Sequence, residues 1–261
     1  EVAGRAPVGE FSAVAPGGDT LCARGGPFHF FVHGGDPRRV VIDFEGGETT
    51  FLGVCWDSWS CTIGGQLGGQ PIFKDSVESL DDFEAAREAG QLAGIYDVDH
   101  PDNPFGGWTI VRVPLCSGDL FWGDATIDYG PDLTIHHRGF RNGQAVMAWL
   151  QTHYPEIEEV VFTGTSIGGY GVMLQVPTVM ETYADARVTV LVDSAVGIIT
   201  QSFFADAFPM WNSLDLLPDE LMTASRQNLE DLRMEDFYVA LANTHPSIRV
   251  AQYTSAHDGV Q

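Results

Sequence analysis

A serine surrounded by glycines is the first residue of this chain that could do chemistry. Ser166 lies in Gly164-Thr165-Ser166-Ile167-Gly168, directly after the apolar residues 160–162. Small flanking residues allow a serine to occupy a strained strand-to-helix turn with its hydroxyl exposed, which is the nucleophile position of G-x-S-x-G hydrolases. The five residues alone fit an ordinary glycine-rich loop equally well. The interpretation therefore depends on what the fold brings to this turn.

A serine hydroxyl attacks an ester only when a base removes its proton and a third group orients that base. In α/β-hydrolases the acid follows the serine in the chain. Asp258 comes after the last predicted strand, and we expect it to be the triad acid. The alternative is a solvated loop aspartate, which is common in a chain this acidic.

The negative charge that forms during ester cleavage needs backbone N–H donors nearby. One is expected from Ile167, directly after the serine. A second is expected from the segment Glu45-Gly46-Gly47-Glu48, where glycine lets the backbone approach a substrate closely. The alternative for this glycine pair is an ordinary tight turn.

Apolar strands alternate with helical segments along the chain, which predicts an α/β fold of the α/β-hydrolase type: a mostly parallel sheet with helices on both faces. Ligands of such sheets bind at the carboxyl ends of the strands. Ser166, Asp193 and Asp258 each lie at the carboxyl end of a predicted strand, so we expect them at one edge. The predicted elements are a hairpin of 28–33 and 39–44, a helix from 76 or 79 to 89, a strand 108–116, a helix 139–154, a strand 158–166, a helix from 167 that Pro177 kinks or restarts, a strand 187–195, helices near 218–231 and 234–243, and a strand 247–258.

Length and charge set outer limits on function. The 261 residues suffice for an irregular N-terminal segment, 1–20, and a single α/β-hydrolase-like domain, 21–261, which we expect to lack its C-terminal strand and helix. The formal net charge is −23, and Lys74 is the only lysine. Nucleic acid is therefore not an expected partner, and anionic membranes would repel the chain. No stretch approaches the roughly 20 apolar residues of a membrane span.

Four cysteines indicate the compartment. Cys55 and Cys61 bracket a short loop and can close a local disulfide, in which case Cys22 would pair with Cys116. Two disulfides predict an oxidising environment, and hence a secreted or periplasmic protein; four buried free thiols are the alternative. No cysteine has metal-site spacing, so we expect neither a metal nor another cofactor. No signal peptide is visible, and Glu1 is expected to begin a mature chain.

Several blocks in order resemble the pectin acetylesterase and Notum family of carboxylesterases: "DTLCARGGPFHFFVH", "VVIDFEGGE", "CWDSWSC", "VRVPLCSGDLFWG", "GTSIGGYGVMLQV", "LVDSA" and "AHDGVQ". The resemblance covers the chain from about residue 19 to 261. It implies an α/β-hydrolase fold and extracellular, metal-independent ester hydrolysis. It implies Ser166 as nucleophile and Asp258 as acid, with oxyanion donors at Gly47, Glu48 and Ile167. It also supports the pairings Cys22–Cys116 and Cys55–Cys61.

The chain departs from that family at the oxyanion segment and at the base. Related proteins often carry tryptophan after the two glycines, where this chain has Glu48; the backbone donor persists, but the pocket wall becomes charged. The family's histidine follows the acid, whereas this sequence ends three residues after Asp258.

None of the histidines in this sequence is expected to be that base. His245 precedes the last predicted strand, and His257 would point away from its neighbour Asp258 in an extended chain. His136 and His137 are expected to start a helix, as surface or capping residues. We therefore expect the base to lie in a C-terminal segment outside this sequence.

The predicted function is a secreted serine carboxylesterase that removes acyl groups, acetyl in the first instance, from a small-molecule or polysaccharide ester. A net charge of −23 suits a neutral acetylated glycan better than de-esterified pectin, which is a polyanion. The alternative is a non-catalytic binding protein on a hydrolase scaffold, because a histidine base is missing; a peptidase is a third interpretation. Several aromatic residues could stack on sugars or line an acyl pocket, or could simply pack in the core: Trp56, Trp59, Trp122, Phe203, Phe204 and Trp211.

Overall fold

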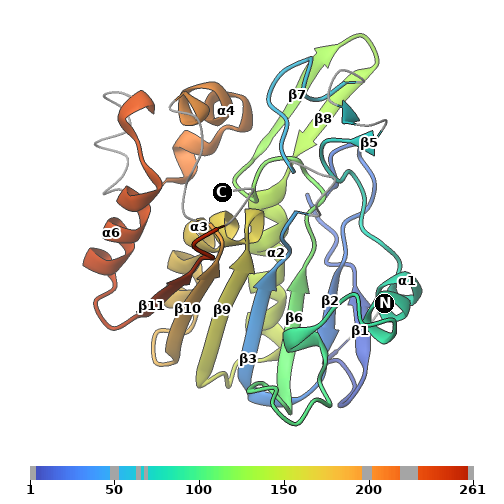
Figure 1. Cartoon of the computed structure of the whole chain (residues 1–261), viewed down its shortest axis with the longest axis vertical. Helices are drawn as coiled ribbons and strands as arrows, with labels where there is room; N and C mark the ends of the chain where they lie inside the picture. The colour runs from blue at the N-terminus through green and yellow to red at the C-terminus, as the bar shows by residue number, and fades with distance from the viewer. Residues whose placement is uncertain are drawn as a thin grey trace.

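A seven-stranded mixed sheet forms the centre of the computed structural model (Figure 1), which describes residues 4–47, 53–62, 66–67, 70–195, 202–217 and 229–257. The strand order is β1-β2-β6-β3-β9-β10-β11. Strands β6, β3, β9, β10 and β11 are parallel, while β2 is antiparallel to both of its neighbours, β6 and β1. This mostly parallel sheet flanked by helices is consistent with the predicted α/β-hydrolase-like fold.

The bounds of the elements are as follows. The strands are β1 (Phe11–Val14), β2 (Phe30–His33), β3 (Asp36–Phe44), β4 (Gln66–Leu67), β5 (Gln70–Pro71), β6 (Trp108–Val113), β7 (Ala125–Gly130), β8 (Leu133–His137), β9 (Glu159–Thr165), β10 (Arg187–Asp193) and β11 (Arg249–Tyr253). The helices are α1 (Leu80–Glu88), α2 (Gly139–His153), α3 (Ile167–Thr182), α4 (Phe203–Trp211) and α6 (Met234–Thr244), with short 3₁₀ turns η2 (Gly94–Tyr96), η3 (Ser213–Leu216) and η4 (Leu229–Asp231).

Side-chain alternation along the central strands fills a core on each face of the sheet. On β3, Val40, Ile42 and Phe44 join the larger core beneath α2 and α3, whereas Val41 joins the smaller core beneath α1. Successive residues of a strand point to opposite faces, so an apolar run such as this one is buried on both sides. The fold therefore holds the ends of β3 and β9 between two packed layers.

The predicted hairpin of β2 and β3 is wrong. Strand β6 lies between them, antiparallel to β2 and parallel to β3. The chain crosses the end of β6 at Gly35, where an added Cβ would lie 2.3 Å from the carbonyl oxygen of Trp108. The Gly-Gly pair therefore serves a close crossing of backbones and not a two-strand turn.

Other elements differ locally from expectation. Residues 11–14, within the segment predicted to be irregular, form β1. Helix α3 continues through Pro177 to Thr182 and does not restart there. The hairpin of β7 and β8 and the helix α4 were not predicted, and Figure 1 shows that hairpin projecting beyond the carboxyl ends of the parallel strands. Of the predicted helix 218–231, residues 218–228 lie outside the described residues.

Within the described residues, no helix has both the length and the apolar character needed to cross a membrane.

Candidate active site

Ser166 occupies a strained position between β9 and α3. Its backbone has φ 53° and ψ −116°, a conformation that residues other than glycine rarely adopt. Its N–H donates to the carbonyl of Asp193 at 2.7 Å, and its own carbonyl accepts from the N–H of Gly169 at 3.0 Å. The strained turn predicted from G-x-S-x-G is thus present, with the serine half-buried.

The glycines of the motif are needed because three backbones meet at this turn. A Cβ at Gly164 would lie 2.4 Å from the carbonyl carbon of Gly168, so strand and helix touch across the serine. A Cβ at Gly168 would lie 1.9 Å from the carbonyl oxygen of Phe44 at the end of β3. Any side chain at either position would push the segments apart.

The loop after β3 lies against the same turn. A Cβ at Gly46 would lie 2.6 Å from the carbonyl oxygen of Thr165, the residue before the serine. The first N–H groups of α3, beginning at Ile167, have no acceptor within their own helix and carry the positive end of its dipole. Donors expected at Gly47 and Ile167 therefore belong to neighbouring segments, whereas Glu48 lies outside the described residues.

A buried ionic network fixes the loop that carries Gly46 and Gly47. Glu45 is 5% exposed, and its Oε1 accepts from Lys74 Nζ at 2.9 Å and from Arg112 Nη2 at 2.8 Å. Its Oε2 accepts from the N–H of Leu115 at 2.8 Å. Glu78 adds a second carboxylate, 2.6 Å from Lys74 Nζ. This network was not predicted from the sequence, although the presence of a single lysine in so acidic a chain could have pointed to Lys74 as its member.

The carboxylates of this network stabilise the charged form of Lys74. Burial alone would lower the pKa of Lys74, but the nearby Glu45 and Glu78 carboxylates outweigh burial and raise it. Burial also raises the pKa of Asp43 to about 6, against an opposing hydrogen bond from Tyr96. The ammonium of Lys74 is therefore firmly charged, and removing its partners would leave a buried cation.

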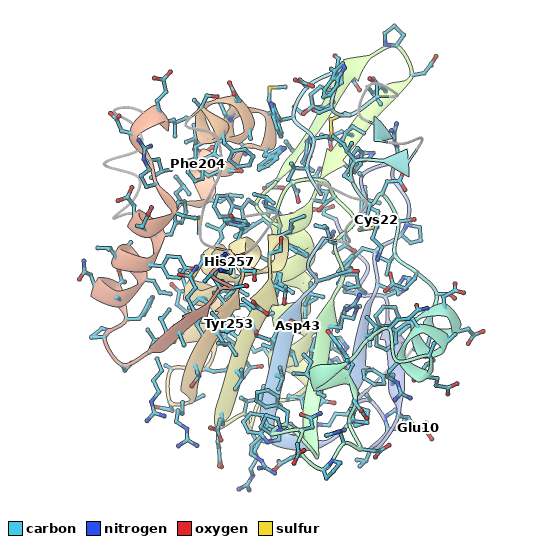
Figure 2. All side chains as sticks on the ribbon, in the orientation of Figure 1. Glu10, Cys22, Asp43, Phe204, Tyr253 and His257 are labelled. Atoms are coloured by element: carbon cyan, nitrogen blue, oxygen red, sulfur yellow. A yellow bond between two sulfur atoms is a disulfide. The ribbon has the colours of Figure 1, made fainter. Side chains whose placement is uncertain are left out.

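Two histidines considered in the sequence analysis, His245 and His257, lie on opposite sides of β11 in the chain. Asp258 lies outside the described residues. His257 is exposed beyond the carboxyl end of β11, and Figure 2 labels it past Tyr253, at the edge where Ser166 lies. His245 ends α6 ahead of β11, which puts it toward the opposite edge of the sheet, as predicted.

The predictions for His136 and His137 are wrong. Both residues end β8 and do not start a helix, and His137 is fully buried. Its Nδ1 lies 3.2 Å from the carbonyl oxygen of Ser117 and its Nε2 lies 2.9 Å from Tyr129 Oη. A carbonyl can only accept, so Nδ1–H donates to it and Nε2 accepts from the tyrosine. His137 is a structural residue.

Both predicted disulfides are present, Cys22–Cys116 and Cys55–Cys61. The first joins the start of the main domain to the end of β6, and the second closes the loop that holds Trp56 and Trp59. Trp59 is 68% exposed and Trp56 is partly buried, so both remain accessible at the surface. The other four aromatic residues considered for the site are core residues: Trp122, Phe203, Phe204 and Trp211.

The buried His137 is expected to make the folded protein less stable as the pH falls. Burial lowers the pKa of His137 to about 4, below the ordinary histidine value of about 6.5. Between these values the unfolded chain binds a proton that the native chain does not, so stability falls as the pH falls. The gap corresponds to about 3 kcal/mol. We expect urea unfolding of His137→Phe to lose less stability between pH 7 and pH 4.5 than the parent chain does.

Other groups titrate in the same range, and the comparison controls for them. The pKa of Asp119 is raised to about 6, mainly by burial, so this carboxyl increases stability as the pH falls from 6. Asp119 is present in both the parent and His137→Phe, so its contribution cancels when the pH dependence of their stabilities is compared. An equal loss of stability in both proteins would contradict the prediction.

Comparison with known proteins identifies the family of the chain. The family model described as Pectinacetylesterase matches residues 18–209 of the 261. The matched part includes the loop after β3, both disulfides and the turn at Ser166. No curated protein matched the chain. On the extent of this match, the chain belongs to the pectinacetylesterase family.

Proposed function

We propose that the protein is a secreted serine esterase that removes acetyl groups from a polysaccharide. Family membership supports acetyl ester hydrolysis on a polysaccharide. The observation that carries the serine mechanism is the position of Ser166 in the strained β9–α3 turn, directly before the first N–H groups of α3 and with the Gly46 loop packed against Thr165. Strain of this kind persists only where the surrounding structure enforces it, and it is concentrated at active sites.

In the proposed reaction, Ser166 Oγ attacks the acetyl carbonyl carbon while a histidine takes its proton. The carbonyl oxygen becomes an oxyanion, which accepts hydrogen bonds from backbone N–H groups of Ile167 and of the loop at Gly47. The sugar alcohol leaves with the proton, and water then cleaves the acetyl-serine to release acetate. Asp258 is proposed to orient the histidine.

Two disulfides support secretion, because such bonds persist in oxidising compartments. The alternative, a binding protein on the same scaffold, does not require the Ser166 hydroxyl to react, so reactivity of that hydroxyl separates the two functions.

A fluorophosphonate probe tests this proposal, because it labels only an activated serine. We expect peptide mapping to find the label on Ser166. We expect His245→Ala to label at the parental rate, since His245 lies toward the opposite edge. His257→Ala tests the histidine at the correct edge: a fall of a hundredfold or more would identify it as the base and would overturn our expectation for that residue. No labelling at Ser166 in an active preparation would refute the proposal.

A further inference from the structure

A surface groove lies among segments that extend beyond the carboxyl ends of the parallel strands (Figure 1). It is open to solvent and has a volume of about 610 Å³. Three segments form it: the Cys55–Cys61 loop, β7 and α4. Figure 1 shows β7 and α4 at the top of the molecule, beyond the carboxyl ends of the parallel strands. Its lining residues are Trp56, Asp57, Ser58, Ile127, Asp128, Tyr129, Asp206 and Met210.

Each segment contributes one exposed aspartate. Asp57 Oδ1 accepts from Ser60 Oγ at 2.7 Å, and Asp128 Oδ1 accepts from Thr134 Oγ1 at 2.6 Å. Asp206 Oδ2 accepts from Ser202 Oγ at 2.8 Å. One oxygen of each carboxylate thus accepts a hydrogen bond from a neighbouring hydroxyl, which fixes the orientation of the carboxylate. The other oxygen can accept a hydrogen bond from a ligand.

No cation neutralises these carboxylates in the described part of the chain. The lining contains neither lysine nor arginine. Two arginines on adjoining segments bind other groups: Arg24 donates to the carbonyl of Cys61 at 3.1 Å, and Arg138 pairs with Asp124 at 2.8 Å and donates to Thr126 Oγ1 at 3.2 Å. A uronate carboxylate in this groove would face three like charges on a chain whose net charge is already −23.

An aromatic surface supplies the other half of a sugar site. Trp56 is partly buried, with its ring in edge contact with Phe203 at 5.6 Å between centroids, so the core holds it in place. Tyr129 also lines the groove, where its side chain is buried and its hydroxyl is hydrogen-bonded to His137. A pyranose can lay an apolar face on a held aromatic ring while its hydroxyl groups donate to the free carboxylate oxygens.

We propose that this groove binds a neutral acetylated glycan and excludes polyuronates, so that the enzyme departs from the substrate in its family's name. The proposal rests on the esterase function above. Sugar hydroxyls satisfy carboxylate acceptors without adding charge, whereas a polyuronate is repelled along its length. The aspartates and Trp56 are the residues that set this preference.

The test compares acetate release from acetylated xylan with release from acetylated polygalacturonate. We expect the parent enzyme to prefer the xylan at low salt. The variant Asp57→Asn/Asp128→Asn/Asp206→Asn should raise the ratio of polygalacturonate to xylan activity by about tenfold. High salt should raise the same ratio in the parent, because screening shortens the range of the repulsion to about 3 Å at 1 M.

A control variant separates the groove from overall charge. Asp81→Asn/Glu88→Gln/Asp185→Asn removes the same three charges, from −23 to −20, at exposed positions outside the groove lining. We expect it to leave the ratio unchanged. If the ratio of polygalacturonate to xylan activity rose equally in both variants, or rose in neither, the proposal would be overturned.

Failure of this proposal is distinguishable from failure of the esterase function. Activity on p-nitrophenyl acetate, compared between the parent and Ser166→Ala, reports the nucleophile without any sugar. If activity on p-nitrophenyl acetate depends on Ser166 but the ratio of polygalacturonate to xylan activity is the same in the groove variant as in the parent, only the specificity proposal fails. Retention of xylan binding by Trp56→Ala in affinity electrophoresis would likewise count against the groove.

Discussion

Replacing Ser166 by alanine is expected to lower kcat on p-nitrophenyl acetate by at least about 10⁴-fold while the protein stays folded. The hydroxyl is the proposed nucleophile, and alanine offers no atom that can form the acetyl-enzyme. The residual rate would come from N–H donors at Ile167 and Gly47, which the substitution leaves in place. Removing Oγ should not unfold the turn, because its backbone bonds to Asp193 and Gly169 remain.

Ser194 provides a matched control on the next strand. It follows β10 as Ser166 follows β9, it has φ 53°, and it is half-buried. Its hydroxyl donates to Asp193 Oδ1 at 2.9 Å, and its N–H donates to the carbonyl of Tyr253 at 2.8 Å. We expect Ser194→Ala to retain kcat within a few fold. If Ser194→Ala lost the activity and Ser166→Ala kept it, the nucleophile would be Ser194.

The local part of this site could be predicted from sequence because it depends on neighbours in the chain. The apolar run before Gly164 and the glycine spacing determine strand, turn and helix within a dozen residues. Helix α1 was equally predictable: Ser79 Oγ accepts from the N–H of Asp82 at 3.2 Å as its cap, and Gly90 follows its end with φ 71°. Such signals require no knowledge of the sheet.

The contacts that build the rest of the site are distant in sequence, and the sequence does not reveal them. Nothing within residues 28–44 shows that β6, some 65 residues later, separates β2 from β3. The burial of His137 likewise depends on Ser117 and Tyr129, which come from other segments. Helix α4 is short, mostly apolar and contains Pro209, so propensity argues against a helix there, although its buried residues Phe203, Ala207 and Trp211 follow helical spacing.

Glu45 is the residue beyond Ser166 whose loss should matter most, and Glu45→Gln is expected to cost about 3 kcal/mol of unfolding free energy. The amide keeps the size of the side chain but removes the charge that faces Lys74 and Arg112. Glu78 still pairs with Lys74, so the cost falls toward the lower end of what breaking a buried ion pair entails. Urea denaturation at pH 7 measures it.

The same substitution should also lower activity, because Glu45 directly precedes Gly46 and Gly47 and ties their loop to Leu115. We therefore assign it as a positioning residue for the oxyanion donors. Misplacing a donor by a fraction of an ångström weakens a contact made in the transition state, so kcat should fall about 10- to 100-fold with little change in KM.

Glu158→Gln is the matched control, since its ion pair with Arg38 at 3.3 Å is exposed and exposed pairs contribute about 0–1 kcal/mol. A purely structural role for Glu45 would reduce the folded fraction without lowering kcat per folded molecule. Active-site titration with the fluorophosphonate probe separates these two cases: full labelling at the parental rate, together with a parental kcat, would show that the network stabilises the fold and does not position the loop.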